Sequence, residues 1–214
     1  MKLPTVAASQ PDASFAKPAS ADQLDRAAAA LRERGFEATV VPGDDAAREA
    51  LLDMVPAGAQ VGEGASVTLD TIGVTAAIEG GSYDAIRPRL RAMDRATQAD
   101  EIRRLGSSPD WFLGSAQAVT LDGQVLLASA TGSQIGPIAS GAGHVVLVVG
   151  AQKVVPDLDT AFARLTDYSF PLEDARIKAV YGGGGSAIRR VLVMNGEMVK
   201  GRTHVLLVAK AVGV

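Results

Sequence analysis

A short series of glycine and hydroxyl residues follows an apolar segment about a third of the way along the chain. Gly62, Gly64, Ser66 and Thr68 alternate with other residues, and a helical pattern comes next. A strand that turns into a helix leaves free backbone N–H groups at the helix N-terminus, which favour an anion. These residues therefore predict an anion-binding corner. The alternative is an ordinary turn capped by Ser66, because the chain has neither GxxxxGK[ST] nor GxGxxG there.

A second corner of similar composition follows a later predicted strand. Thr131, Gly132 and Ser133 precede a predicted helix or turn near residues 135–139. Two hydroxyls and a glycine could cradle an oxyanion, and a capped turn is again the alternative. Ligands of open α/β sheets collect at the carboxyl ends of the strands. The two corners could therefore line one crevice.

Three charged residues are candidates for chemistry beside these corners. Lys153 follows an apolar strand and could hold an anion in the same crevice, although a solvated lysine is the alternative. If there is catalysis, Glu63 and Asp122 are the only acids close to the corners, and both are weak candidates. The dipeptide formed by Asp122 and Gly123 is fully explained as a hairpin turn.

Metal and thiol chemistry find no support in the sequence. The chain of 214 residues contains no cysteine, which excludes disulfides, thiolate zinc sites, a cysteine nucleophile and all-cysteine iron–sulfur clusters. Its two histidines, His144 and His204, each stand at the start of an apolar strand without another ligand at metal spacing. We therefore expect no metal site and no cofactor.

Composition excludes two classes of partner. The net charge is −3 with mixed signs, and aromatic residues make up 4%, so neither a basic field nor a stacking platform for nucleic acid is present. No apolar run is long enough to cross a bilayer. The first residues lack the apolar core of a signal peptide, so we expect a cytoplasmic protein.

The order of predicted elements indicates an α/β fold. Helices are expected at 21–34, 44–54, 68–79, 93–105 and 157–165, and strands at 36–41, 59–62, 110–113, 117–120, 124–128, 144–149, 191–194 and 204–209. Alternating helices and strands predict parallel strands joined by crossovers. The last two strands are expected to form a hairpin or an edge pair. Residues 21–214 are expected to be one domain after a flexible lead-in, 1–20, and four glycines, 182–185, to be a flexible linker.

Four blocks of sequence, in this order, resemble the LUD-domain family, which is named for lactate utilisation proteins. They are VGEGASVTL at 61–69, DWFLGSAQAVTLDG at 110–123, HVVLVVGAQKVVPDL at 144–158 and GRTHVLLV at 201–208. The resemblance implies a three-layer Rossmann-like fold similar to the NagB/RpiA/CoA-transferase superfamily. It also implies a role around oxidation of lactate or a similar organic acid. Relatives of this fold bind sugar phosphates, CoA thioesters or folates in the crevice that the two corners would form.

The chain departs from the family pattern at three places. The second corner usually reads DGNGNR in one branch of uncharacterised members, whereas Ser129, Ser133 and Gln134 stand here for the acid, the second amide and the arginine. Ala65 replaces a glycine of the first motif. The cysteine cluster that many of those members carry is absent from residues 179–190. The chain therefore resembles single-domain members that lack the cluster.

These observations favour a LUD-like protein that binds a small anionic metabolite, such as an organic acid, a phosphate ester or a CoA-type ligand. One alternative is a non-catalytic accessory subunit or homo-oligomer with a vestigial crevice, for which an exposed apolar face over residues 205–212 would be the sign. Another is an enzyme like a phosphosugar isomerase or a CoA transferase. By fold analogy, Glu63 would then act as a base or a nucleophile.

Overall fold

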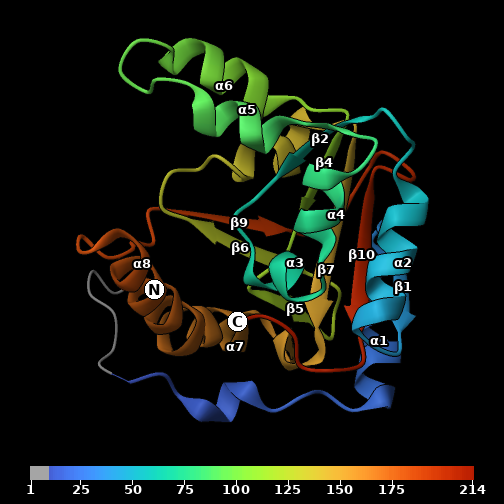
Figure 1. The fold of residues 1–214 in the computed structure, drawn as a ribbon. Helices are drawn as coiled ribbons and strands as arrows, with labels where there is room; N and C mark the ends of the chain where they lie inside the picture. Colours follow the sequence, from blue (N-terminus) through green and yellow to red (C-terminus); the bar gives the residue numbers. More distant parts are fainter. Residues whose placement is uncertain (1–9) are drawn as a thin grey trace.

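Six parallel strands form the central sheet of the chain, whose computed structural model describes residues 10–214 (Figure 1). In sheet order the strands are β1 (Glu37–Val41), β10 (Thr203–Val208), β7 (His144–Gly150), β4 (Trp111–Gly114), β2 (Gln60–Glu63) and β3 (Asp84–Ala85). Each neighbouring pair is parallel. The predicted crossover topology is therefore confirmed, and the mixed α/β architecture agrees with a three-layer Rossmann-like fold.

Side chains of the central strands alternate between two hydrophobic cores. On one face, Val146 and Val148 of β7 pack with helices α2 (Asp44–Met54), α3 (Val67–Thr71) and α4 (Val74–Gly80). On the other face, Val145 and Leu147 pack with helix α1 (Ala21–Glu33) and with a second, smaller sheet. Both faces of the sheet are covered, which explains the continuous apolar runs of β7 and β10, such as residues 205–208.

The second sheet has the order β8 (Val154–Val155), β5 (Ala118–Thr120), β6 (Val125–Ser129) and β9 (Arg190–Met194). Strands β5 and β6 form the predicted antiparallel hairpin, with Gly123 at φ 80° in its turn. Helix α7 (Leu158–Arg164) packs against the outer face of this sheet. Helix α8 (Phe170–Tyr181) follows a turn of π-helix, Leu165–Ser169, and the sequence did not predict it.

The prediction that the last two strands pair with each other is wrong. Strand β9 pairs with β6 in the second sheet, whereas β10 lies between β1 and β7 in the central sheet. All four residues from Val205 to Val208 are buried, because helices and the second sheet cover both faces of β10. The last strand is therefore not the exposed interface face that we considered.

Two predicted helices differ from those observed. The helix expected at 68–79 is divided into α3 and α4 at Gly73, which has φ 75°. The helix expected at 93–105 begins only at Ala99, as α6 (Ala99–Ser107), and a separate α5 (Ile86–Ala92) precedes it. The Asp94 carboxylate accepts hydrogen bonds from the Ala96 N–H and the Thr97 hydroxyl, which stabilise a turn instead of a helix. Helices α5 and α6 project together above β2 (Figure 1).

Part of the expected lead-in is packed on the domain. Residues Ala13–Ala16 form a short 3-10 helix. The Asp12 N–H donates to the Asp167 carbonyl, and the Ala19 N–H donates to the carbonyl of Ala151. The rest of the lead-in, residues 1–9, lies outside the described residues. Between residues 10 and 214 no helix has the length and apolar character needed to cross a membrane.

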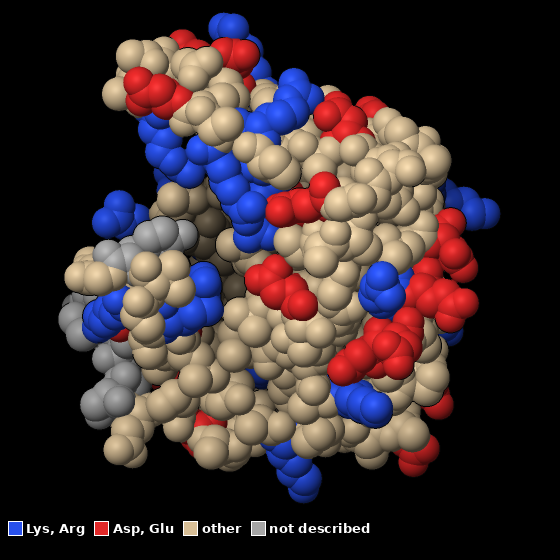
Figure 2. Space-filling model, viewed as in Figure 1, with Lys and Arg blue, Asp and Glu red and all other residues tan. Residues whose placement is uncertain are grey.

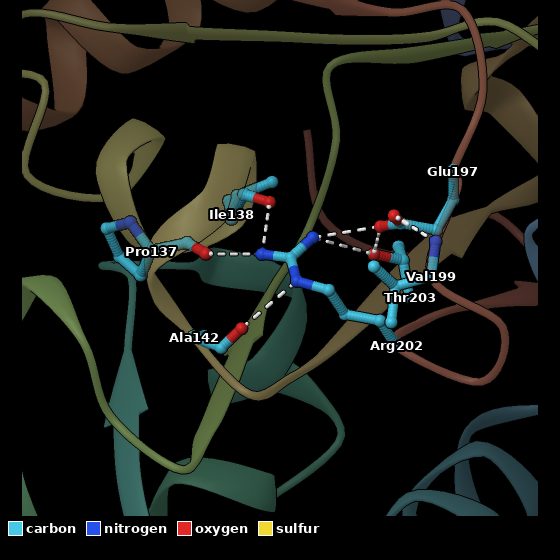
Figure 3. Close-up of polar contacts among 7 residues, drawn as sticks. All are labelled: Pro137, Ile138, Ala142, Glu197, Val199, Arg202 and Thr203. Carbon is cyan, nitrogen blue, oxygen red and sulfur yellow. Dashed lines mark hydrogen bonds and ion pairs between the residues drawn. The ribbon is translucent and has the colours of Figure 1, made fainter.

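A buried ion pair lies at the end of the central sheet where its parallel strands begin, which we call the amino edge (Figure 3). Arg202 precedes β10, and its Nη1 lies 2.9 Å from Oε2 of Glu197. The other guanidinium nitrogens donate to backbone carbonyls of the π-helix Pro137–Gly141 and the residue after it, namely those of Pro137, Ile138 and Ala142. Thr203 and the Val199 N–H donate to the same carboxylate. Arg202 therefore ties the start of β10 to the segment that leads into β7.

Candidate functional site

The carboxyl ends of the parallel strands lie at the end of the sheet opposite Arg202, which we call the carboxyl edge. Strand β2 ends at the first corner, 62–68, strand β4 ends just before Ser115, and β7 continues into a 3-10 turn, Ala151–Lys153. This edge is where ligands of open α/β sheets bind. The structure therefore brings the first corner and Lys153 to the position at which the sequence placed a crevice.

Lys153 is buried at this edge and is 2% exposed. Its Nζ donates to the Thr68 hydroxyl at 2.9 Å and to the Ser115 hydroxyl at 3.0 Å. Ser115 in turn donates to the carbonyl of Val148 at 2.7 Å. The alternative of a solvated lysine is therefore wrong. Ser115 was not predicted, although it stands directly after the strand and glycine of its motif.

No acidic side chain neutralises the Lys153 amine. None of the ion pairs formed within residues 10–214 includes it. Burial, and then the positive charge of Arg164, lower the pKa of Lys153 from 10.5 to about 7. The amine is therefore about half neutral near pH 7, because desolvation and a like charge both disfavour its protonated form.

Arg164 of α7 is a second buried cation beside this edge, and it is fully buried. Its Nε donates to the carbonyl of Gln152 at 3.0 Å, and its Nη1 donates to the Ser169 hydroxyl and the carbonyl of Gln117. Its Nη2 is also buried and has no hydrogen-bond partner among the described residues. Burial lowers the pKa of Arg164 to about 10, with a smaller opposing effect of Tyr168. The guanidinium remains protonated at neutral pH and keeps a free donor.

The last residues of the sequence, 209–214, which we call the covering segment, lie over the same edge. The Gln152 side chain binds this segment, accepting from the Val212 N–H and donating to the carbonyls of Val212 and Gly213. A Cβ atom on Gly213 would collide with the Thr68 hydroxyl, so the backbone of the segment lies directly against the partner of Lys153. In Figure 1 the segment runs from the end of β10 along the lower edge of the sheet.

The glycines and serine of the first corner have identifiable structural roles. The Ser66 hydroxyl accepts from the Leu69 N–H at 3.3 Å and caps α3. Gly62 packs on Pro109 and Phe112, where a Cβ atom would lie only 3.0 to 3.1 Å from their carbons. A Cβ atom on Gly64 would lie 2.6 Å from Oε1 of Gln134. Gly64 therefore brings the first corner into contact with the loop of the second.

The second corner, 129–134, is a turn held by its own hydroxyls and by an arginine. Thr131 donates to the Ser133 hydroxyl at 3.1 Å, and the N–H of Gly132 donates to Ser129 Oγ at 2.9 Å. Arg190 of β9 donates to the carbonyl of Ala130 at 3.2 Å and packs against Gly132. No interaction links the described atoms of 131–133 to Lys153. The two corners touch each other, whereas only the first also reaches the buried lysine.

Lys and Arg side chains gather around a hollow between α5 and the start of β9 (Figure 2). The arginines carried by these two segments are Arg87, Arg89, Arg91, Arg189 and Arg190. Because Arg190 binds the second corner, this corner lies beside the same hollow. The three arginines of α5 each form an ion pair with an acidic side chain, whereas Arg190 forms none within the described residues.

The two acidic candidates lie apart from each other. Both carboxylate oxygens of Glu63 are buried without a hydrogen-bond partner in the described chain, and burial raises its pKa against the opposing charge of Arg87. Asp122 lies in the hairpin turn at the other end of β6 from the second corner, in an exposed ion pair with Arg26 at 3.2 Å. The arrangement offers no acid–base pair made from the two.

The histidines make structural contacts. The ring of His144 stacks on Trp111 with 4.4 Å between centroids, and Nε2 of His204 lies 3.0 Å from the Thr39 hydroxyl. Within residues 10–214, His, Cys, Asp and Glu form no group of three or more that could hold a metal ion.

Comparisons with known proteins point to one family. The model of the LUD domain matches residues 24–208. No curated protein matches the chain. Among solved structures, the crystal structure of a DUF162 family protein from Deinococcus radiodurans superposes with a TM-score of 0.56 at 14% identity, covering 89% of this chain and 99% of that one. This similarity shows the fold alone.

Proposed function

The chain belongs to the LUD-domain family, and from this premise we propose that it binds a small anionic metabolite at the carboxyl edge of its central sheet. Family membership supports a role related to lactate utilisation. The ligand classes that fit are an organic acid, a phosphate ester or a CoA-type molecule. The observation that carries the proposal is Lys153, a buried amine at this edge whose partners are hydroxyls.

The charge balance at the edge supports an anion as the missing partner. A buried charge is costly unless it is paired, and Lys153 has only the hydroxyls of Thr68 and Ser115. Arg164 adds a second positive charge, since its Nη2 has no partner within the described residues. A bound carboxylate or phosphate would offset both charges, and it would raise the pKa of the Lys153 amine.

The two corners and Arg190 offer further contacts. The spaces beside Gly64 and Gly132 are filled by the side chains of Gln134 and Arg190, so a ligand would reach the backbone there by displacing these side chains. Arg190, which forms no ion pair within the described residues, would attract an anion toward the second corner by its charge. Three hydroxyls of the corners already take part in hydrogen bonds within the chain, namely those of Ser66, Thr131 and Ser133. Each could form one further hydrogen bond to a ligand.

A thermal-shift screen tests the proposal. The panel contains lactate, pyruvate, phosphosugars, CoA, acetyl-CoA, nucleotides and folates. A ligand at 100 times its Kd stabilises the native state by about 2.7 kcal/mol. We expect a shift that Lys153→Met abolishes and that Lys200→Met, which removes an exposed lysine, retains.

Two outcomes would contradict the proposal. A shift that is equal in Lys153→Met places the ligand elsewhere. No shift with any member of the panel, in a well-folded protein, favours a non-catalytic accessory subunit or homo-oligomer. The isomerase alternative gains no support from the geometry, because Glu63 and Asp122 lie apart. The CoA-transferase alternative, which needs Glu63 alone, stays a prediction.

A further inference from the structure

We propose that Lys153 binds a small oxo acid covalently, by forming an imine between its amine and the carbonyl carbon of the ligand. This inference rests on the proposed anion site and narrows its ligand to a molecule that has both a carbonyl and a carboxylate. The carbonyl would react with the amine of Lys153, and the carboxylate would lie near the guanidinium of Arg164.

An amine must be neutral to attack a carbonyl, and the surroundings of Lys153 favour the neutral form. The amine is enclosed by protein, and within residues 10–214 the charged group that shifts its pKa is the Arg164 guanidinium. Desolvation and a neighbouring cation are the two means by which proteins activate a lysine as a nucleophile. The pKa of Lys153, about 7, leaves a large neutral fraction at neutral pH.

The hydrogen bonds of Lys153 suit proton transfer during such a reaction. Ser115 donates its own proton to the carbonyl of Val148, so its oxygen accepts from the amine. The Thr68 hydroxyl lies 2.9 Å from Nζ and 3.3 Å from Ser115 Oγ. It can therefore donate to a neutral amine or accept from a protonated one. This hydroxyl is placed to carry a proton between the nitrogen and a reacting oxygen.

Arg164 supplies an independent reason to expect a carboxylate here. Its side chain is fully buried, yet its Nη2 has no hydrogen-bond partner in the part of the chain that the structure describes. An unpartnered buried donor destabilises the folded state, and more so when it is charged. A carboxylate that accepted from Nη2 would satisfy this donor, and the guanidinium is close enough to the amine for its charge to lower the pKa of Lys153.

The reaction balances without another reactant. The Lys153 nitrogen attacks the carbonyl carbon, and the π electrons of the carbonyl move to its oxygen. One amine proton then transfers to this oxygen, giving a carbinolamine. The second amine proton joins the hydroxyl, which leaves as water while the C=N bond forms. The only products are the imine and one water molecule, so no oxidant or reductant is needed.

The covering segment must move for a ligand to enter. The backbone of Gly213 lies against Thr68, and Gln152 holds the segment through three hydrogen bonds to Val212 and Gly213. Gln152→Ala removes these bonds without touching Lys153. We expect this variant to form the adduct faster than the unaltered chain.

Reductive trapping tests the inference. The full chain is incubated with pyruvate, 2-oxobutyrate or glyoxylate and with cyanoborohydride, and peptide mass mapping then locates any adduct. We expect the adduct on Lys153, its loss in Lys153→Arg, and its retention in Lys200→Met. Because the pKa of the amine is about 7, the rate of trapping should fall about tenfold from pH 8 to pH 6.

The outcomes separate this inference from the proposed function. Ligands that raise the melting temperature but leave no adduct on Lys153 would overturn the imine and leave the anion site intact. Adducts spread evenly over exposed lysines would overturn the imine as well. Absence of both shift and adduct would overturn both proposals. Mapping on the unaltered chain decides the question even if Lys153→Arg does not fold.

Discussion

Two buried cations lie at opposite edges of the same sheet, and their surroundings differ completely. Arg202 at the amino edge binds the Glu197 carboxylate and three backbone carbonyls, so each of its nitrogens has a partner. Lys153 at the carboxyl edge has two hydroxyls and no carboxylate. Both side chains are almost fully buried. The two cations therefore do not differ in burial. They differ in whether a carboxylate of the described chain neutralises the charge.

This difference separates a structural cation from a functional one. The carboxylate of Glu197 would have its pKa raised by burial, but hydrogen bonds from Val199, Thr203 and Arg202 and the charge of Arg202 lower it overall. The amino edge is thus internally satisfied. The carboxyl edge keeps a positive charge that nothing in the described chain compensates, as expected where a ligand completes the site.

Replacing Arg202 should have the largest effect on stability. Arg202→Met removes one partner of a buried pair and leaves the Glu197 carboxylate and three carbonyls without their donor. Breaking such a pair costs about 3 to 5 kcal/mol. Urea denaturation measures this loss in free energy of unfolding. A loss below about 1 kcal/mol would remove the contrast between the two edges.

Replacing Lys153 should have an effect of the opposite sign. Lys153→Met keeps an unbranched side chain that is one atom shorter and removes the uncompensated amine, while Ser115 retains its bond to Val148. We expect the free energy of unfolding at pH 6 to stay equal or to rise by about 1 to 4 kcal/mol. Lys200→Met is the matched surface control, which should change it by less than about 0.5 kcal/mol. A clear loss of stability would make Lys153 a structural residue like Arg202.

The pH dependence of stability should show that the charged form of Lys153 destabilises the native state. The native pKa, about 7, is below the unfolded value of 10.5, so the unfolded chain binds more protons between these pH values. Stability of the unaltered chain relative to Lys153→Met should therefore rise with pH from about 7 to 10, by at most about 1.4 kcal/mol per pH unit. Its cost is fully present below pH 7. A difference that does not change over this range would contradict the buried amine.

The smallest effect on the free energy of unfolding is expected at an exposed ion pair between an arginine and a carboxylate. Arg26 and Asp122 lie 3.2 Å apart with side chains 64% and 61% exposed. Arg26→Ala should change the free energy of unfolding by no more than about 1 kcal/mol, and the change should decrease in high salt. Denaturation at two salt concentrations measures it. If Arg26→Ala destabilises the protein as much as Arg202→Met, burial does not explain the strength of the ion pair between Arg202 and Glu197.

Local pattern sufficed for much of the fold. The apolar runs at 36–41 and 144–149 and the turn at Asp122 and Gly123 predicted β1, β7 and the β5–β6 hairpin. The position of β10 was missed, because strand pairing depends on which distant segments share a sheet. Its four consecutive apolar residues, 205–208, were the available signal, since a strand buried on both faces is apolar throughout.

The candidate site was predictable only in part for the same reason. Glycine and hydroxyl residues after a strand are a local signal, and so is a lysine just beyond an apolar strand. Ser115 carries this signal too, because it directly follows the strand that ends in Gly114, and it was missed. Gln152 and Arg164 give no such signal, because tertiary packing alone brings them to the edge. Arg164 in particular has the sequence context of an ordinary amphipathic helix.

The position of β10 in the sheet has a consequence for folding of the protein during its synthesis on the ribosome. Among the described residues, strand β1 pairs in the central sheet with β10 alone, and more than 160 residues of chain separate the two. During translation β1 must therefore wait, with its edge unpaired, until residues 203–208 have been made and have left the exit tunnel. Such distant pairing slows folding and exposes strand edges to aggregation. A cell that makes this chain would benefit from a chaperone that shields β1 during that interval.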